Sequence, residues 1–215
     1  MSLADHLERI FEADRTLRKA ESALLREKGG EALASLLQTE TARALRMDDR
    51  KEATMRLERL ADLCAQVPGP RMADALIAIL NDQDPRVRVA AGEALRDVGY
   101  ERYAEVARAI ERALDRDDDG PAMAELPWVL AEIGEPSALP LIRRFLAHPN
   151  AEIVAAAIEA LAQLGDRDAE SDLQRFTEDA RMVTIEDFED DAKTTLGELA
   201  VDALAMLGFP PDDAS

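Results

Sequence analysis

Side chains that could act as nucleophiles, metal ligands or general bases are few and scattered in this sequence. The single cysteine, Cys64, lies in the apolar run LADLCAQV, which favours a buried small side chain over a reactive thiol. The two histidines, His6 and His148, have no second His or Cys at a ligand spacing, and no glycine-rich phosphate loop occurs. We therefore expect no catalytic residues, no metal and no cofactor.

The charge of the chain restricts the kinds of partner that it can bind. The formal net charge is −19, which argues against binding to nucleic acid phosphates or to an anionic membrane surface. The acidity is concentrated at one end, because residues 166–215 hold 15 acids and 4 bases whereas residues 1–50 hold 10 and 9. The negative charge either serves solubility or indicates a protein partner with a basic surface.

Composition favours a helical protein. Hydrophobic residues make up 47% of the 215, enough for a core, and aromatic residues make up only 4%, which is low for a β-sandwich or a barrel. No stretch approaches 18 apolar residues and no signal peptide opens the chain, so a cytoplasmic protein is expected.

Four segments of the sequence share a pattern that ends in glycine. Each has Leu four residues before the glycine, an aliphatic residue directly before it, and small or aliphatic residues between. This spacing predicts a helix with one apolar face, closely approached by its neighbour and ended by the glycine in a left-handed conformation. The segments are 91–99, 126–134, 157–165 and 200–208.

A second amphipathic helix precedes three of these segments and is joined to it by a polar turn. Asp84, Asp119 and Asn150 occupy the same place in the three turns and are predicted to cap the helices that follow. Pro85 and Pro121 come at first or second helical positions, where proline is tolerated. The preceding helices are predicted over 72–80, 103–114 and 137–146.

The repeated pattern resembles the short bacterial kind of HEAT repeat. The residues that carry the resemblance are Asp84-Pro85-x-Val87-Arg88, Ala90-Ala91, Ala94-Leu95 and Val98-Gly99, and the segment 135–165 is similar over its whole length. The likeness covers about 71–208, with departures at Met123, Pro127 and Lys193. It implies an all-α fold: a right-handed α-solenoid of HEAT-like helix pairs. The His-Glu pairs of HEAT-like di-iron hydroxylases and the basic surface of HEAT-like DNA glycosylases are lacking here.

An additional N-terminal amphipathic helix, 1–28, precedes the array. Leu3, Ile10, Leu17 and Leu24 recur every seven residues, and the helix either caps the array or docks on a partner. The array is expected over 31–209 and a disordered tail over 210–215. Its units are 31–69, which is degenerate, 71–99, 101–134, 135–165, and 166–208 with an insertion at 181–192.

One position of the repeat points away from the expected core. It lies six residues before each glycine and two before the core leucine, and it holds Glu93, Trp128, Glu159 and Asp202. An exposed Trp among acids is typical of an interface anchor. The alternative is that Pro127 bends the helix and turns Trp128 inward as a filler between units.

The segment RMVTIEDFEDDAKTTLG, 181–197, interrupts the last unit and is expected to be a loop or a short irregular helix. It either covers the end of the core or forms an acidic docking loop. In the second case Phe188 is the apolar contact and Glu186 and Asp187 supply charge.

These observations predict a non-catalytic protein–protein interaction module in a bacterial cytoplasm, acting as an adaptor, scaffold or regulator. One alternative is an inhibitor or immunity-type protein that neutralises a basic enzyme. A lyase-like or chaperone protein acting on a small molecule is a further alternative.

Overall fold

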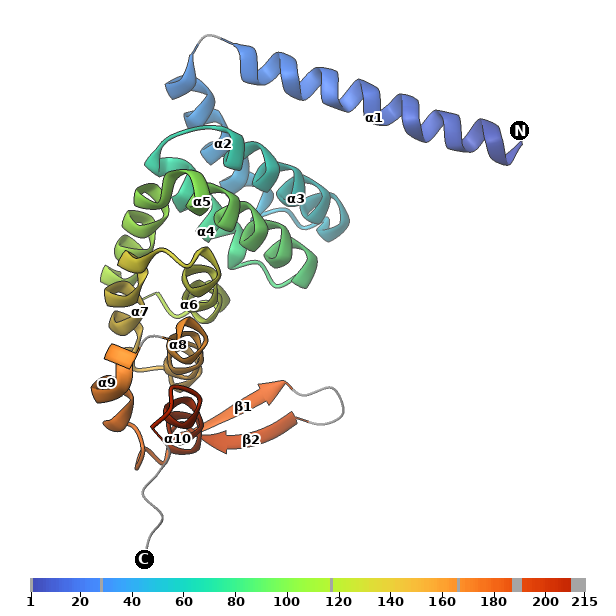
Figure 1. Cartoon of the computed structure of the whole chain (residues 1–215). Helices are drawn as coiled ribbons and strands as arrows, with labels where there is room; N and C mark the ends of the chain where they lie inside the picture. The colour runs from blue at the N-terminus through green and yellow to red at the C-terminus, as the bar shows by residue number, and fades with distance from the viewer. Residues whose placement is uncertain (1, 28, 117, 166, 187–190, 210–215) are drawn as a thin grey trace, which may run out of the picture.

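The computed structural model describes residues 2–27, 29–116, 118–165, 167–186 and 191–209, which form an α-solenoid with one β-hairpin near its end (Figure 1). The α-helices are α1 (Leu3–Arg26), α2 (Gly30–Ala44), α3 (Arg50–Gln66), α4 (Pro70–Leu80), α5 (Pro85–Asp115), α6 (Pro121–Ile133), α7 (Leu139–Phe145), α8 (Ala151–Leu164), α9 (Glu170–Gln174) and α10 (Leu196–Met206). Two short 3-10 helices, η1 (Pro136–Ala138) and η2 (Arg167–Ala169), precede α7 and α9. The strands are β1 (Met182–Glu186) and β2 (Asp191–Thr195).

Successive helices pack in two columns. In Figure 1, α6, α8 and α10 follow one another in one column, while α7 and α9 lie beside them in the other. One continuous apolar core runs between the columns and is built mainly from Leu, Ile, Val and Ala side chains. Each helix therefore buries its apolar face against the helices of its own and the adjoining units, as α6 does against α8 and α8 does against α10.

Glycine ends the second helix of a pair at two of the predicted places. Gly134 and Gly165 follow α6 and α8 as C-caps with φ of 66° and 68°, a left-handed conformation that favours glycine. Gly208, with φ of 87°, lies just beyond α10. These positions confirm the predicted stops for α6 and α8.

The predicted stop at Gly99 is wrong. The helical conformation continues two residues past Gly99 and is broken at Arg102, where φ is −141° and ψ is 48°. The Arg102 guanidinium donates a hydrogen bond of 2.7 Å to the carbonyl of Ala65 in α3, which holds the break. The range of α5 therefore contains two helices that meet at a kink, and the second of them, 103–115, is the helix predicted over 103–114.

Gly99 has a packing role instead. A Cβ at Gly99 would lie 2.2 Å from Cδ1 and 2.8 Å from Cγ1 of Ile133, so a larger residue there would force the Ile133 side chain of α6 to move. Gly92 lies seven residues earlier in α5, on the same face, and has room for a Cβ. The nearest atom to a Cβ there would be Cδ1 of Leu80, at 3.9 Å.

The predicted N-caps are confirmed for Asp84 and Asn150, whose side chains accept backbone N–H bonds from Arg86 and Glu152. The prediction for Asp119 is wrong, because α6 is capped by Gly120. Asn81, from the preceding turn, supplies the acceptor: its Oδ1 lies 3.0 Å from the Ala122 nitrogen, and it would clash with any Cβ at residue 120. The final helix is capped by Thr195 in β2, not by Lys193.

Polar contacts join neighbouring turns along one edge of the array. The Thr54 hydroxyl donates to Asp84 Oδ2 at 2.9 Å. The Arg50 guanidinium donates to both oxygens of buried Asp82, at 2.7 and 2.9 Å. These bonds tie helix α3 to the turn that precedes α5.

The expectation of a loop or irregular helix at 181–197 is corrected by the hairpin of β1 and β2. The strands pair antiparallel from Met182–Thr195 to Glu186–Asp191. Val183, Thr184 and Ile185 are β-branched and favour a strand, and Val183 is buried where β1 contacts α8. Phe188 and Asp187 and the tail 210–215 lie outside the described residues.

Helix α1 extends away from the array, and Figure 1 shows it touching the rest of the molecule near its C-terminal end. None of its residues is buried. It begins with a capping box in which the Ser2 and Asp5 side chains each accept the other's backbone N–H bond, at 3.1 and 2.6 Å.

The packing role of Gly99 predicts opposite effects for two alanine substitutions in α5. We expect Gly99→Ala to lower the free energy of unfolding by about 1–3 kcal/mol through overpacking. We expect Gly92→Ala, the matched control, to raise it by about 0.5–1 kcal/mol because alanine is the better helix former. Urea unfolding followed by circular dichroism measures both values. In an Ile133→Ala background Gly99→Ala should no longer destabilise; a cost that persists there contradicts the assigned contact.

The capping carboxylate of Asp84 predicts a pH-dependent stability. Hydrogen bonds from Arg86, and then from Thr54, hold the pKa of Asp84 well below its ordinary value of 3.8. The charged form therefore stabilises the fold fully above that pH, and the contribution is lost as the pH falls toward the lower folded-state pKa. Melting temperatures of wild type and Asp84→Asn should differ near neutral pH. The difference should begin to shrink below about pH 4 and continue to shrink as the pH falls toward the folded-state pKa. A difference that stays constant with pH, or one matched by exposed Asp97→Asn, contradicts this role.

Candidate functional site

A pocket of about 320 Å³ lies between α5 and α6 and is lined on both sides by residues one helical turn apart. Arg88, Gly92 and Arg96 succeed one another along α5 at spacings of four. Trp128 lies on α6 between Glu125 and Glu132. The glycine leaves the space that the pocket occupies, since a side chain there would project between the two arginines. The remaining lining residues are Leu80, Pro85, Val89 and Val129.

Two ion pairs across the helices border the pocket. Nε of Arg88 lies 3.8 Å from Oε1 of Glu125, and the Arg96 guanidinium donates to Glu132. Arg88 also donates to the backbone carbonyls of the turn that precedes α5, at 3.1 and 3.3 Å. These bonds fix the positions of both guanidinium groups on the walls of the pocket.

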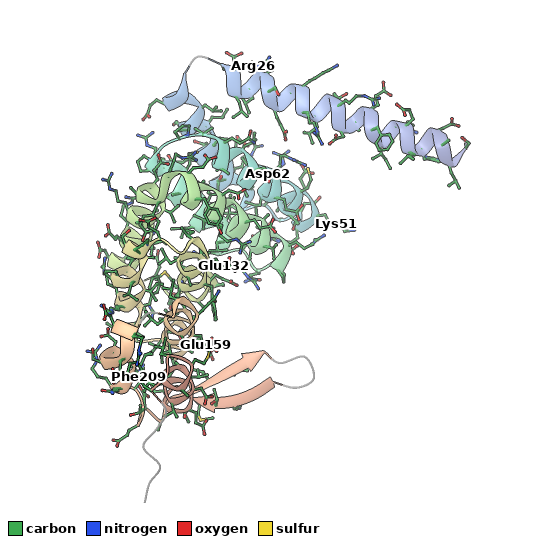
Figure 2. The ribbon with its side chains drawn as sticks, viewed as in Figure 1. Arg26, Lys51, Asp62, Glu132, Glu159 and Phe209 are labelled. Carbon is green, nitrogen blue, oxygen red and sulfur yellow. The ribbon has the colours of Figure 1, made fainter. Side chains whose placement is uncertain are left out.

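Trp128 is half-buried and lines this pocket, so its indole contacts the interior on one side and remains accessible on the other. Glu132, which lines the same pocket one helical turn after Trp128, is labelled in Figure 2. An accessible indole next to ordered guanidinium and carboxylate groups is an arrangement that anchors a protein side chain. Helix α6 runs on unbroken through Pro127, which is buried.

The four residues singled out by the repeat lie on four helices that pack in succession, α5, α6, α8 and α10. Glu93 and Asp202 are exposed, whereas Trp128 and Glu159 are half-buried. Burial, and then the neighbouring charge of Glu152, raise the pKa of Glu159 above its ordinary value. We call Glu93, Trp128, Glu159 and Asp202 the outer row.

The hairpin adjoins the outer row at α8. Oε1 of Glu152 accepts a hydrogen bond of 3.0 Å from the backbone N–H of Thr184 in β1. Asp202 lines a shallower hollow together with Glu178, Asp179 and Glu198. The acidic residues near the C-terminal end of the chain thus lie next to the outer row. Glu186 ends β1, and its side chain, like Phe188 and Asp187, is not among those described.

The side chains that could act as nucleophile, base or metal ligand are the cysteine and the two histidines, and they lie in separate parts of the structure. Cys64 is fully buried, and burial raises the pKa of its thiol to about 12. His148 is buried in a turn, where Nδ1 accepts from the Asn150 N–H and Nε2 lies 3.2 Å from the Asp118 carbonyl. His6 is exposed on α1. Within the described ranges no three His, Cys, Asp or Glu residues gather as metal ligands would.

Sequence reasoning missed the arginines and the glycine of the pocket. Arg88 was noticed only as part of the repeat pattern, and the spacing Arg88-x3-Gly92-x3-Arg96 was the available signal. This spacing does not indicate a pocket unless the neighbouring helix is known, because the pairing of Arg96 with Glu132 spans 36 residues.

The family model for HEAT repeats matches residues 107–186, from the second half of α5 to the end of β1. This match confirms the resemblance to HEAT repeats over those residues. No curated protein matches the chain. HEAT repeats are generally protein-interaction modules. None of the helices in the described residues is long and apolar enough to cross a membrane.

Burial of Cys64 predicts an unreactive thiol. At pH 8 the folded protein should not react with Ellman's reagent within an hour, because the thiol is both inaccessible and protonated. The reaction should go to completion in 8 M urea. Ser35→Cys, at an exposed position of α2, provides the control and should react at once in the folded protein. Fast modification of wild type in buffer would contradict the burial.

Proposed function

We propose that this protein is a non-catalytic protein–protein interaction module, an adaptor, scaffold or regulator, that binds a partner with a basic surface. The observation that carries the proposal is the accessible indole of Trp128 in the pocket between α5 and α6. Its place in the outer row puts a large amphipathic anchor among the acids Glu93, Glu159 and Asp202.

Charge supports the choice of partner. The pocket arginines are paired with Glu125 and Glu132, so they do not offset the acids around them. The chain carries a net charge of −19, and an acidic surface speeds encounter with a basic protein through long-range attraction. We propose a non-enzymatic role in a bacterial-type cytoplasm, which the buried state of the lone cysteine supports.

The hairpin extends the proposed surface. Its strands adjoin α8 next to the outer row, and their connection carries Asp187 and Phe188. We include Glu186, Asp187 and Phe188 as partner contacts, on the strength of an apolar residue among acids at that position.

Affinity capture with the full chain, quantified by mass spectrometry, tests the proposal. A specific partner should be captured by wild type and by Met55→Ala, an exposed control on α3. It should be lost with Trp128→Ala and with the double change Glu93→Lys and Asp202→Lys. Replacing 187–190 by Gly-Ser residues measures how much the connection of the hairpin contributes to capture of the partner.

The purified partner then allows direct titration, because Trp128 is the only tryptophan and its emission reports the pocket. We expect a spectral shift on binding, affinity about 10-fold or more weaker for Trp128→Ala, and further weakening as salt rises. A partner that binds all variants equally contradicts the proposal. Loss of the partner's own enzymatic activity on binding would identify an inhibitor rather than a scaffold.

A further inference from the structure

Helix α1 has an apolar stripe that its own chain leaves uncovered. Leu3, Leu7, Ile10 and Leu17 follow at spacings that keep them on one face, and their exposed fractions are 89, 51, 63 and 36%. Phe11, beside the stripe, is 48% exposed. Among the described residues, no residue of α1 is buried. Such a stripe on a single helix is normally covered by another helix.

Among the described residues, the contacts that attach α1 to the array lie near its C-terminal end. Oε1 of Glu21 lies 3.3 Å from Nη1 of Arg59 in α3, and Leu24 and Leu25 are half-buried against the core. Arg26, labelled in Figure 2, marks this end, and the N-terminal end of the helix lies far from the array (Figures 1 and 2). The stripe from Leu3 to Leu17 is therefore presented on a projecting arm.

Charge along α1 is divided between its two halves. Residues 3–14 carry four acids and one base, a net charge of −3, whereas residues 15–26 carry four bases and one acid, a net charge of +3. A second copy laid antiparallel brings the acidic half of each helix against the basic half of the other. A parallel copy brings like charges together, which opposes association.

We propose that α1 pairs antiparallel with α1 of a second copy of this chain, forming a two-fold symmetric dimer. The two-fold axis passes between Ala13 and Asp14, so Ile10 of one copy lies beside Leu17 of the other, and Glu12 lies near Arg15. Asp14 lies between Ile10 and Leu17 on the same face, and its carboxylate is paired with Arg18 of its own helix at 2.9 Å, whereas the small Ala13 side chain lies at the edge of the face.

The attachment of α1 to the array also favours this orientation. Since each array joins α1 at its C-terminal end, an antiparallel pair places the two arrays at opposite ends of a rod about 36 Å long. A parallel pair places both arrays at the same end, where they crowd. The antiparallel dimer leaves the outer row of each copy free, and it is independent of the function proposed above.

A membrane surface fits α1 less well than a second copy does. Helices that lie on anionic membranes have a basic polar face. Here the polar residues sum to zero net charge over 3–26, and the whole chain is strongly acidic.

Sedimentation of the full chain between about 1 and 200 μM tests the proposal, because a single helix pair buries less surface than most stable dimers. We expect a concentration-dependent dimer, at least 10-fold weakened by Ile10→Asp, with Met55→Asp as the exposed control on α3. A chain that stays monomeric at 200 μM, or a dimer unaffected by Ile10→Asp, overturns it.

Charge reversal tests the orientation. Glu8→Arg with Glu12→Arg makes both halves of α1 basic, and Arg15→Glu with Lys19→Glu makes both acidic, so each pair of changes should weaken the dimer. All four changes in one chain invert the two halves, and the antiparallel dimer should be restored. Circular dichroism verifies that the helix persists. Failure of the fourfold variant to dimerise overturns the proposal.

Cross-linking provides a second measure of orientation. Cys64 is buried and leaves a silent background. Ala13→Cys, near the two-fold axis, should form a dimer-spanning disulfide under mild oxidation, whereas Leu3→Cys should not. Efficient cross-linking of Leu3→Cys indicates a parallel pair and overturns the proposal.

Discussion

The close approach of neighbouring helices is the constraint on which the rest of this structure depends. No helix of the array has enough buried surface to be stable by itself, so each must fit tightly against the next. Between α5 and α6 the fit is set by Gly99, which accepts the side chain of Ile133. The pocket beside Trp128 arises from the same pair of helices, because Gly92 leaves unfilled space where they meet. A residue pattern that serves packing thus also produces the recess in which a partner side chain can be held.

The turns and the helix faces have separate tasks. Side chains in the turns and the first helical turns, such as Asn81, Asp84 and Thr54 of α3, bond to backbone and carboxylate groups of the neighbouring turn. They hold the pairs in register along one edge. None of these turn contacts involves a side chain of the outer row on α5, α6, α8 and α10.

Much of the fold could be predicted from the sequence because its signals are local. Capping at Asp84 and Asn150, and the left-handed stops at Gly134 and Gly165, depend on residues within one turn of the helix end. The failures have distant causes. Gly99 fails as a stop because Ile133 and Ala65 decide its surroundings, and Asp119 fails as a cap because Asn81 supplies the acceptor.

The candidate site was accessible to sequence reasoning only in part. Trp128 is identified by its place in the repeat, since an aromatic residue replaces an acid. The ion pairs of Arg88 and Arg96 with α6 depend on which helices are neighbours and on their relative rotation, which no local pattern encodes. The hairpin is difficult to predict because the β-branched run Val183–Ile185 is only three residues long and is followed at once by acidic residues.

The bend at Arg102 has a consequence for how the molecule unfolds. In an ideal repeat array each unit exchanges between open and closed states with coupling only to its neighbours, so fraying proceeds one unit at a time from the ends. Here a single non-helical residue, Arg102, separates the last helix of one unit from the first helix of the next. With no longer turn between them, we expect the backbone amides on the two sides of Arg102 to exchange more nearly together than those of units joined by a loop.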